Sequence, residues 1–211
     1  MHACAKTTRT AAALTAAIAL VAVPATTAAA AETAPVGTTS VVNATVVGVD
    51  YDTWKRDVAN VVTEARSWIE ARTGNSGGEK QAIVLDIDNT ALETYFHPFW
   101  KQPTPAVADV RNLADYADSR GVAVFFITAR PGIVKSLTDW NLGETGYPVD
   151  GLYVSDFLDL FEVSAYKTRK RAEIEANGYE IIANIGNTST DLVGGHAERT
   201  FKLPDYNGQL V

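Results

Sequence analysis

The chain has 211 residues, with 18 basic and 25 acidic side chains and a formal net charge of −7. This acidic balance argues against nucleic acid or an anionic membrane as a primary partner. The only cysteine, Cys4, lies in a predicted export signal, so the exported chain would have no disulfide, no thiol nucleophile and no cysteine-rich zinc site.

Residues 1–31 have the pattern of a secretory signal peptide. Lys6 and Arg9 give a positive start without acidic residues, a short apolar stretch follows, and Ala29-x-Ala31 fits a signal-peptidase site. The apolar stretch is too short to span a membrane as a helix. We therefore predict a cleaved signal, no membrane anchor and a secreted, extracellular protein.

The remainder is long enough for one domain with its own core. We expect residues 32–49 to form a flexible N-terminal arm and residues 50–211 to form the domain. Its sequence predicts helices at 51–74, 104–119, 131–142 and 164–176 and strands at 81–87, 122–127, 151–154, 181–185 and 200–203. This alternation is typical of an α/β fold, a doubly wound and mostly parallel sheet with helices on both faces.

The first helix is predicted by apolar residues at helical spacing, among them Trp54, Val58 and Trp68. Asp50 or Asp52 could cap its start, and Gly74 could end it. Its two tryptophans are expected to pack on the domain rather than bind a ligand.

The strand at 81–87 ends in two carboxylates, Asp86 and Asp88. Buried carboxylates must be paired or metal-bound, which points to a site. The two would share a face of the strand, and a break near Asn89 could separate them. One could then attack or hold a metal while the other carries a proton. The alternative is a simple strand end followed by an Asp-Asn turn.

Residues 92–100 follow no period and predict a loop rich in aromatic residues. These rings could clamp an organic group above the carboxylates or fold over the core, and His97 has the same two interpretations. Thr128 and the pair Asn187 and Asp191 also follow predicted buried strands. In such folds the ligand lies at the carboxyl ends of the strands, where the strand order reverses.

Taken together, these segments resemble the four motifs of the haloacid-dehalogenase-like (HAD) superfamily of phosphohydrolases. The matching segments, in chain order, are Asp86-Ile87-Asp88-Asn89-Thr90, Ile127-Thr128-Ala129-Arg130, Lys167 at a helix start, and Gly186-Asn187-Thr188-Ser189-Thr190-Asp191. The chain is most similar to the class B/IIIB acid-phosphatase-like branch, which includes secreted bacterial phosphatases and plant vegetative storage proteins. The resemblance implies a HAD-like Rossmannoid fold with a minimal cap.

The resemblance also implies roles. Asp86 would be the nucleophile that forms an aspartyl-phosphate, and Asp88 the acid and base. Thr128 and Lys167 would hold the phosphoryl oxygens. The Mg²⁺ cofactor would be held by Asp86, Asp88 through its backbone carbonyl, Asn187 and Asp191. A phosphomonoester dianion approaches a carboxylate only if cations neutralise it, so Mg²⁺ and a lysine suit this pair.

We therefore expect a secreted, Mg²⁺-dependent phosphomonoesterase of the acid phosphatase type that acts on a small-molecule phosphomonoester. The alternative is a non-catalytic storage or binding protein on the same fold. Asn187 is compatible with this alternative, because the fourth motif has Asp at this position. Asn187 either ligates the metal or only shapes the turn. A phosphoaccepting receiver domain is excluded by the order of the motifs. Arg130 could bind substrate or cap the strand end.

Overall fold

The computed structural model describes residues 48–156 and 158–210. The predicted signal and nearly all of the predicted arm lie outside the described residues. The α-helices are α1 (Tyr51–Gly74), α2 (Ala108–Ser119), α3 (Lys135–Glu144), α4 (Val163–Ala176) and α5 (Ser189–Leu192). The strands are β1 (Lys80–Leu85), β2 (Ala123–Pro131), β3 (Gly151–Ser155), β4 (Tyr179–Gly186) and β5 (Thr200–Lys202), and two short 3-10 helices are η1 (Gly132–Val134) and η2 (Asp159–Phe161).

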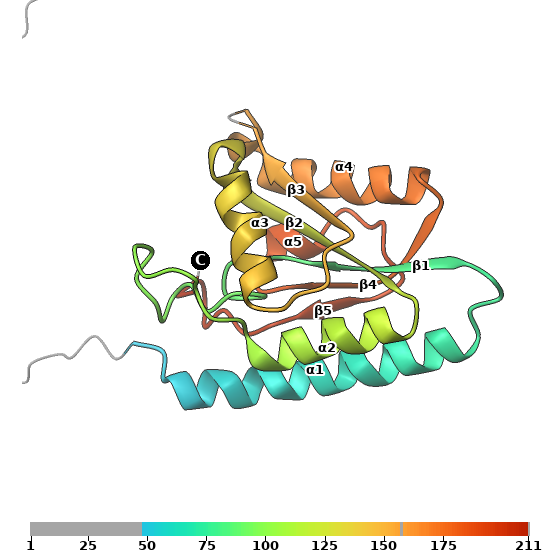
Figure 1. The fold of residues 1–211 in the computed structure, drawn as a ribbon, viewed down its shortest axis with the longest axis horizontal. Coiled ribbons are helices and arrows are strands. Elements are labelled where there is room, and N and C mark those ends of the chain that lie inside the picture. Colours follow the sequence, from blue (N-terminus) through green and yellow to red (C-terminus); the bar gives the residue numbers. More distant parts are fainter. Residues whose placement is uncertain (1–47, 157, 211) are drawn as a thin grey trace, which may run out of the picture. The chain divides into compact units, whose positions relative to one another are not determined.

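The five strands form one parallel sheet in the order β3-β2-β1-β4-β5 (Figure 1). From β1 the chain moves outward through β2 and β3, and it then crosses to β4 on the other side of β1. The strand order therefore reverses between β1 and β4, whose ends are paired through Leu85 and Ile185. This is where the fold predicts a ligand crevice.

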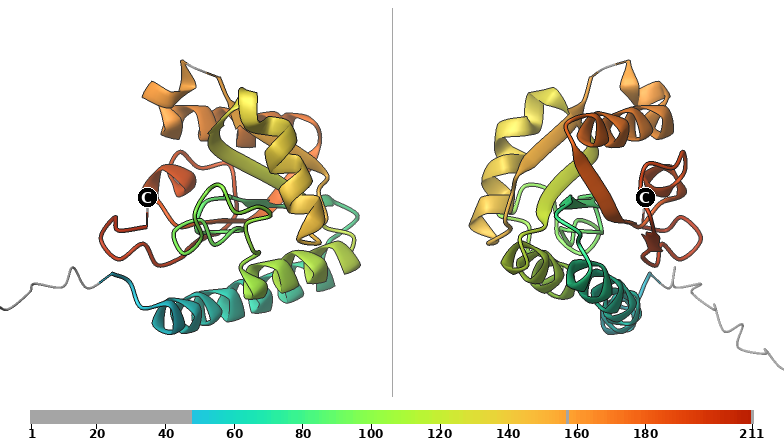
Figure 2. Two further views of the ribbon diagram at one scale, coloured as in Figure 1. Left: turned by 60° about the vertical axis from the view of Figure 1, so that its left-hand side comes forward. Right: turned by 90° about the vertical axis from the view of Figure 1, so that its right-hand side faces the viewer.

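Helices cover both faces of the sheet, with α1 and α2 on one side and α4 on the other (Figure 2). Successive strand residues point to opposite faces. Ile83 and Leu85 of β1 belong to the core cluster that contains the buried residues of α1 and α2, whereas Ala82 and Val84 pack in a second cluster with Tyr166 of α4. The predicted doubly wound α/β fold is confirmed.

Helix α1 has the bounds and the buried stripe that its periodicity predicts. Asp50 caps it, because its Oδ1 accepts a hydrogen bond of 2.7 Å from the Thr53 N–H. Trp54 is fully buried, and the Trp68 indole donates to the Ile182 carbonyl at 2.7 Å. Both tryptophans thus attach α1 to the domain. Within the described part of the chain, no helix is long and apolar enough to cross a membrane.

The prediction that the second helix starts at residue 104 is wrong, since α2 begins at Ala108. The Thr104 N–H donates to Asn141 Oδ1 at 2.9 Å, and the Thr104 carbonyl accepts from Asn141 Nδ2 at 2.8 Å. Ala106 forms an antiparallel bridge with Leu92. Pro105 contributes to this extended conformation, because a residue before proline disfavours the helical region.

The predicted boundary between the second strand and the third helix is also wrong. β2 continues to Pro131, which pairs with Ser155 of β3 after an irregularity in the register. The short η1 follows, and α3 then runs through Gly143 to Glu144. The chain turns at Gly146, whose φ of +80° favours glycine.

Candidate active site

The two carboxylates after β1 have different surroundings. Asp86 continues the β1 ladder, since its N–H donates to the Ile185 carbonyl at 3.0 Å, and it is only 6% exposed. The chain then turns sharply, and Asn89 has a positive φ of 56°. The Asp88 side chain, directly before Asn89, is 44% exposed. One carboxylate is thus buried and its neighbour is open to solvent.

Lys167 connects the ends of β1 and β4. It lies on α4, the helix that connects β3 to β4 along the chain, and it is 3% exposed. Its Nζ is 2.5 Å from Asp86 Oδ1 and 2.6 Å from Asp191 Oδ1. A buried ammonium needs such partners, and the two carboxylates need a cation in return. The structure therefore brings together three residues that the sequence assigns to three separate motifs.

Burial and charge act in opposite directions on these groups. Burial raises the pKa of the Asp86 carboxyl to about 7, with further upward contributions from Asp191 and Asp88, although the Lys167 ammonium lowers it. Burial alone would lower the pKa of Lys167, but Asp86 and Asp191 outweigh it and raise that pKa. Lys167 therefore stays charged, whereas burial opposes the ionisation of Asp86 and the Lys167 ammonium favours it.

Asp191 is held by the short segment between β4 and α5. Its Oδ2 accepts from the Thr188 N–H at 2.8 Å, and its carbonyl accepts from Asn184 and from the buried Arg171. At Gly186 a Cβ would lie 2.4 Å from the Asp191 Cβ, so only glycine fits there. The sequence does not predict these roles of Arg171 and Asn184, because Arg171 lies on a helix rich in charged residues and Asn184 inside an apolar strand.

Asn187 is 1% exposed and uses its two amide atoms differently. Its Nδ2 donates to the Leu210 carbonyl at 2.8 Å, and its Oδ1 accepts from Thr90 Oγ1 at 3.4 Å. Asn89 Nδ2 donates to the same Leu210 carbonyl at 2.9 Å. Leu210 thus ties the turn after β1 to the turn after β4. A backbone carbonyl has no residue signature, so the sequence could not predict this contact.

Thr128 is fully buried in β2, and its hydroxyl accepts from the Arg130 N–H at 3.1 Å. Among the described residues, that hydroxyl makes no hydrogen bond to Asp86 or Lys167. The Arg130 guanidinium donates to both oxygens of Asp88, from Nη2 to Oδ1 at 2.8 Å and from Nε to Oδ2 at 3.0 Å. Arg130 therefore contacts a predicted catalytic residue directly.

Asp88 lines two cavities. The first has a volume of about 360 Å³ and is lined by Asp86, Asp88, Lys167, Asn187 and Asp191, among others; we call it the carboxylate cavity. The second has about 330 Å³ and is lined by Asp88, Arg130, His97, Phe99, Val134 and Leu137, among others; we call it the loop cavity. Asp88 thus lines both the cavity that contains Asp86 and Lys167 and the cavity beside the aromatic loop.

The rings of the aromatic loop point in different directions. Phe96 packs inward against Tyr51 and Trp54 of α1, with ring centroids 4.9 and 4.8 Å apart. Phe99 is 80% exposed and lines the loop cavity. Some rings of the loop therefore cover the core, and another faces the site.

The donor set around Asp86 suits Mg²⁺. The Asp86 and Asp191 carboxylates and the Asn187 amide line one cavity, and Mg²⁺ prefers oxygen ligands while keeping several waters. Over residues 48–156 and 158–210, no group of three or more His, Cys, Asp or Glu side chains is placed to hold a metal. A metal here would therefore take few protein carboxylates, as Mg²⁺ does.

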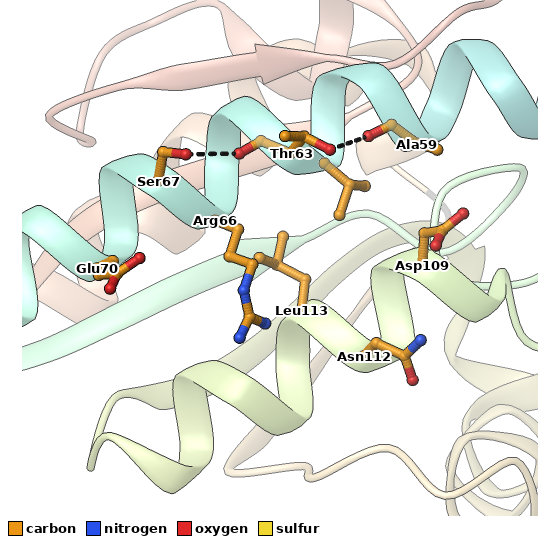
Figure 3. Close-up of a pocket in the computed structure, with 9 residues that line it drawn as sticks. Ala59, Thr63, Arg66, Ser67, Glu70, Asp109, Asn112 and Leu113 are labelled. Atoms are coloured by element: carbon orange, nitrogen blue, oxygen red, sulfur yellow. Dashed lines mark hydrogen bonds between the residues drawn. The ribbon is translucent and has the colours of Figure 1, made fainter.

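A further groove of about 290 Å³ lies between α1 and α2 (Figure 3). The Thr63 hydroxyl donates to the Ala59 carbonyl at 2.8 Å, and the Ser67 hydroxyl donates to the Thr63 carbonyl at 3.0 Å. The Arg66 guanidinium lies 3.6 Å from the centre of the Tyr116 ring. These groups are engaged within the helical layer, and the groove contains no residue of the four motifs.

A family model described as HAD superfamily, subfamily IIIB (Acid phosphatase) matches residues 1–209. Two similar relatives are the stem 28 kDa and stem 31 kDa glycoproteins of Glycine max, each 33% identical over 151 residues, or 60% of this chain. The chain spans 59% and 51% of their respective lengths.

Among solved structures, the class C acid phosphatase of Bacillus anthracis is similar, with a TM-score of 0.62 and 18% identity over 74% of this chain and 80% of that one. The crystal structure of the same enzyme with tungstate bound has a TM-score of 0.61. At this level of identity the match supports the fold.

Proposed function

This chain belongs to the acid phosphatase family that forms subfamily IIIB of the HAD superfamily, and we propose that it is a phosphomonoesterase. One observation carries the proposal. The buried Lys167 ammonium joins Asp86 and Asp191 at the carboxyl ends of β1 and β4, where the strand order reverses. The Lys167 ammonium places positive charge beside the carboxylate that would attack, and a bound Mg²⁺ would add the remaining charge that a phosphoryl dianion needs.

In the proposed reaction, an Asp86 carboxylate oxygen attacks phosphorus, and the alcohol leaves with the electron pair of the broken P–O bond. Asp88 gives a proton to the leaving oxygen. A water molecule then attacks the phosphorus of the aspartyl-phosphate and loses a proton to Asp88. Inorganic phosphate forms and the Asp86 carboxylate is restored. The Lys167 ammonium beside Asp86 favours the ionised form that a nucleophile needs, and the exposed Asp88 can exchange protons with solvent.

Cationic side chains make the first step feasible. Lys167 would hold one phosphoryl oxygen from its place beside Asp86, and Thr128 remains a proposed contact at the end of β2. Arg130 now occupies both oxygens of Asp88. A dianion beside Arg130 would attract the guanidinium, and an Asp88 oxygen would become free to carry the proton.

We propose Mg²⁺ as the cofactor, held by Asp86, Asp191, the Asn187 amide oxygen and the Asp88 backbone carbonyl. When bound, it would neutralise charge on the phosphoryl oxygens. The chain's own contribution is to keep the oxygen donors in place, through Lys167 on Asp86 and the Leu210 carbonyl on the Asn187 amide.

The alternative of a storage or binding protein on this fold has one observation in its favour, the amide of Asn187 where the fourth motif has a carboxylate. It predicts no turnover of any phosphomonoester. The retention of Asp86, Asp88 and Lys167 in a connected site supports the enzyme. We also propose that the protein is secreted, on the pattern of residues 1–31.

The test is phosphate release from 4-nitrophenyl phosphate with Mg²⁺ by the wild type and by Asp86→Asn. Asp118→Asn serves as the control, because Asp118 is an exposed aspartate at the end of α2. We expect turnover in the wild type and the control and none in Asp86→Asn. An inactive wild type, or an active Asp86→Asn, would reject the proposal.

A further inference from the structure

Asp88 divides the site into the carboxylate cavity and the loop cavity. If Asp86 attacks phosphorus and Asp88 protonates the leaving oxygen, the phosphoryl group lies on the Asp86 side of Asp88. The organic part of the substrate then extends to the other side, into the loop cavity. This step rests on the proposed function.

The loop cavity contains a histidine that the motifs do not explain. His97 lines it together with Asp88 and Arg130, and its Nε2 is 3.1 Å from Glu93 Oε2. The Glu93 carboxylate is 6% exposed and lies behind His97 rather than among the cavity-lining residues. A buried carboxylate bonded to an imidazole orients the ring and selects its tautomer.

Tyr51 of α1 completes the arrangement from 42 residues away. Its hydroxyl is 3.0 and 2.9 Å from the two Glu93 oxygens. Burial raises the pKa of the Tyr51 phenol to about 12, and the Glu93 carboxylate adds to that rise, so the phenol stays protonated and donates. The Tyr51 ring also packs against Phe96. The segment that carries His97 is therefore fastened to α1.

The contact with Glu93 leaves the other ring nitrogen of His97, Nδ1, for a ligand. Because Glu93 accepts at Nε2, that nitrogen carries the proton, and Nδ1 is the second nitrogen of the ring. Among the described residues, Nδ1 has no hydrogen-bond partner. The Phe99, Val134 and Leu137 side chains supply apolar surface in the same cavity.

We propose that His97 binds a polar substituent on the organic part of the substrate, with Glu93 and Tyr51 as positioning residues. The substrate class is then a phosphomonoester of a ring-bearing alcohol. The ring packs on the apolar wall of the loop cavity, and a hydrogen-bonding substituent on the ring reaches Nδ1.

The experiment compares phenyl phosphate with phenyl phosphates that carry a carboxamide at the meta or para position. A carboxamide both donates and accepts, so it can pair with Nδ1 in either protonation state. In His97→Gln the side-chain amide of the glutamine can take the place of Nε2 and keep the Glu93 contact. In His97→Asn it can take the place of Nδ1 and keep the substrate contact.

We expect His97→Gln to raise KM for the better carboxamide ester about tenfold, with kcat within about twofold, and to leave phenyl phosphate unchanged. His97→Asn should retain most of the preference. Tyr51→Phe removes only a hydroxyl and should raise the same KM by a smaller factor. A merely structural role would change both esters equally.

The chain offers matched controls. His196 pairs with Glu175 at 2.6 Å and Tyr206 donates to Asp57 at 2.7 Å, and none of these four lines the loop cavity. His196→Gln and Tyr206→Phe should keep the substrate preference. An active wild type without any preference for a carboxamide ester, or equal losses for both esters in His97→Gln and Tyr51→Phe, would overturn the inference. A wild type inactive on every ester would instead reject the proposed function.

Discussion

Replacing Asn187 by Asp, the residue of the family motif, should destabilise this particular chain in the absence of metal. The Asn187 Nδ2 donates to the buried Leu210 carbonyl at 2.8 Å. An aspartate would place a carboxylate oxygen against that carbonyl and add a third carboxylate beside Asp86 and Asp191. The lost hydrogen bond and the desolvated charge cost about 2–3 kcal/mol together. For a domain of this size, that lowers Tm by about 5–10 °C.

The assay is calorimetric unfolding in EDTA and in Mg²⁺, with Asn60→Asp as the control because Asn60 is exposed on α1. Mg²⁺ should raise the Tm of Asn187→Asp more than that of the wild type, since a carboxylate compensates better for dehydration of the ion. An unchanged or higher Tm of Asn187→Asp in EDTA would refute the role given to the Leu210 contact. An equal Mg²⁺ effect in both proteins would indicate that residue 187 shapes the turn without binding metal.

Further predictions concern the two carboxylates, the glycine of the fourth motif and export. Asp88→Asn should slow alkyl phosphates far more than aryl phosphates, because an acid matters most for a basic leaving group; equal losses in a steady-state comparison would indicate a structural role. Without metal, the raised pKa of Asp86 means that its protonated form is favoured by folding. The contribution of this protonated form to stability is present below pH 4 and is lost as the pH rises to about 7. The unfolding free energy of Asp86→Asn should therefore fall less between pH 4 and pH 7 than that of the wild type. Parallel curves of unfolding free energy against pH would contradict this. Gly186→Ala should cost about 1–3 kcal/mol and reduce activity, because its Cβ meets Asp191; urea unfolding showing wild-type stability would exclude the close approach. N-terminal sequencing of protein collected outside the cell should begin near Glu32, and a retained Met1 would contradict cleavage.

The sheet and its polar edge could be predicted from the sequence because both leave local patterns. Buried strands appear as apolar runs, and Asp86, Thr128 and Asn187 each interrupt or follow such a run. Parallel strands place their carboxyl ends at one edge, which brings Asp86 and Asp191 together without further information. The helical periodicity extends back to residue 104, but α2 begins only at Ala108, because Pro105 keeps the residue before it extended.

The long-range contacts that hold the site residues in place have no local pattern in the sequence. The Leu210 carbonyl is a backbone group, and Tyr51 reaches Glu93 across 42 residues. Arg171 lies on a helix rich in charged residues, so its burial depends on the loop after α5, whose carbonyls it binds. Such interactions depend on how the elements pack, and only the three-dimensional structure provides that.

The central claim is that Asp86 forms a covalent phosphoryl intermediate. The direct measurement is mass spectrometry of peptides from protein quenched in acid during turnover of a phosphomonoester, with Asp86→Asn in parallel. We expect a phosphoryl group on Asp86 in the wild type and none on that peptide in the variant. Turnover with phosphorylation of another residue, or with no phosphorylated peptide in a quench fast enough to trap the intermediate, would contradict it.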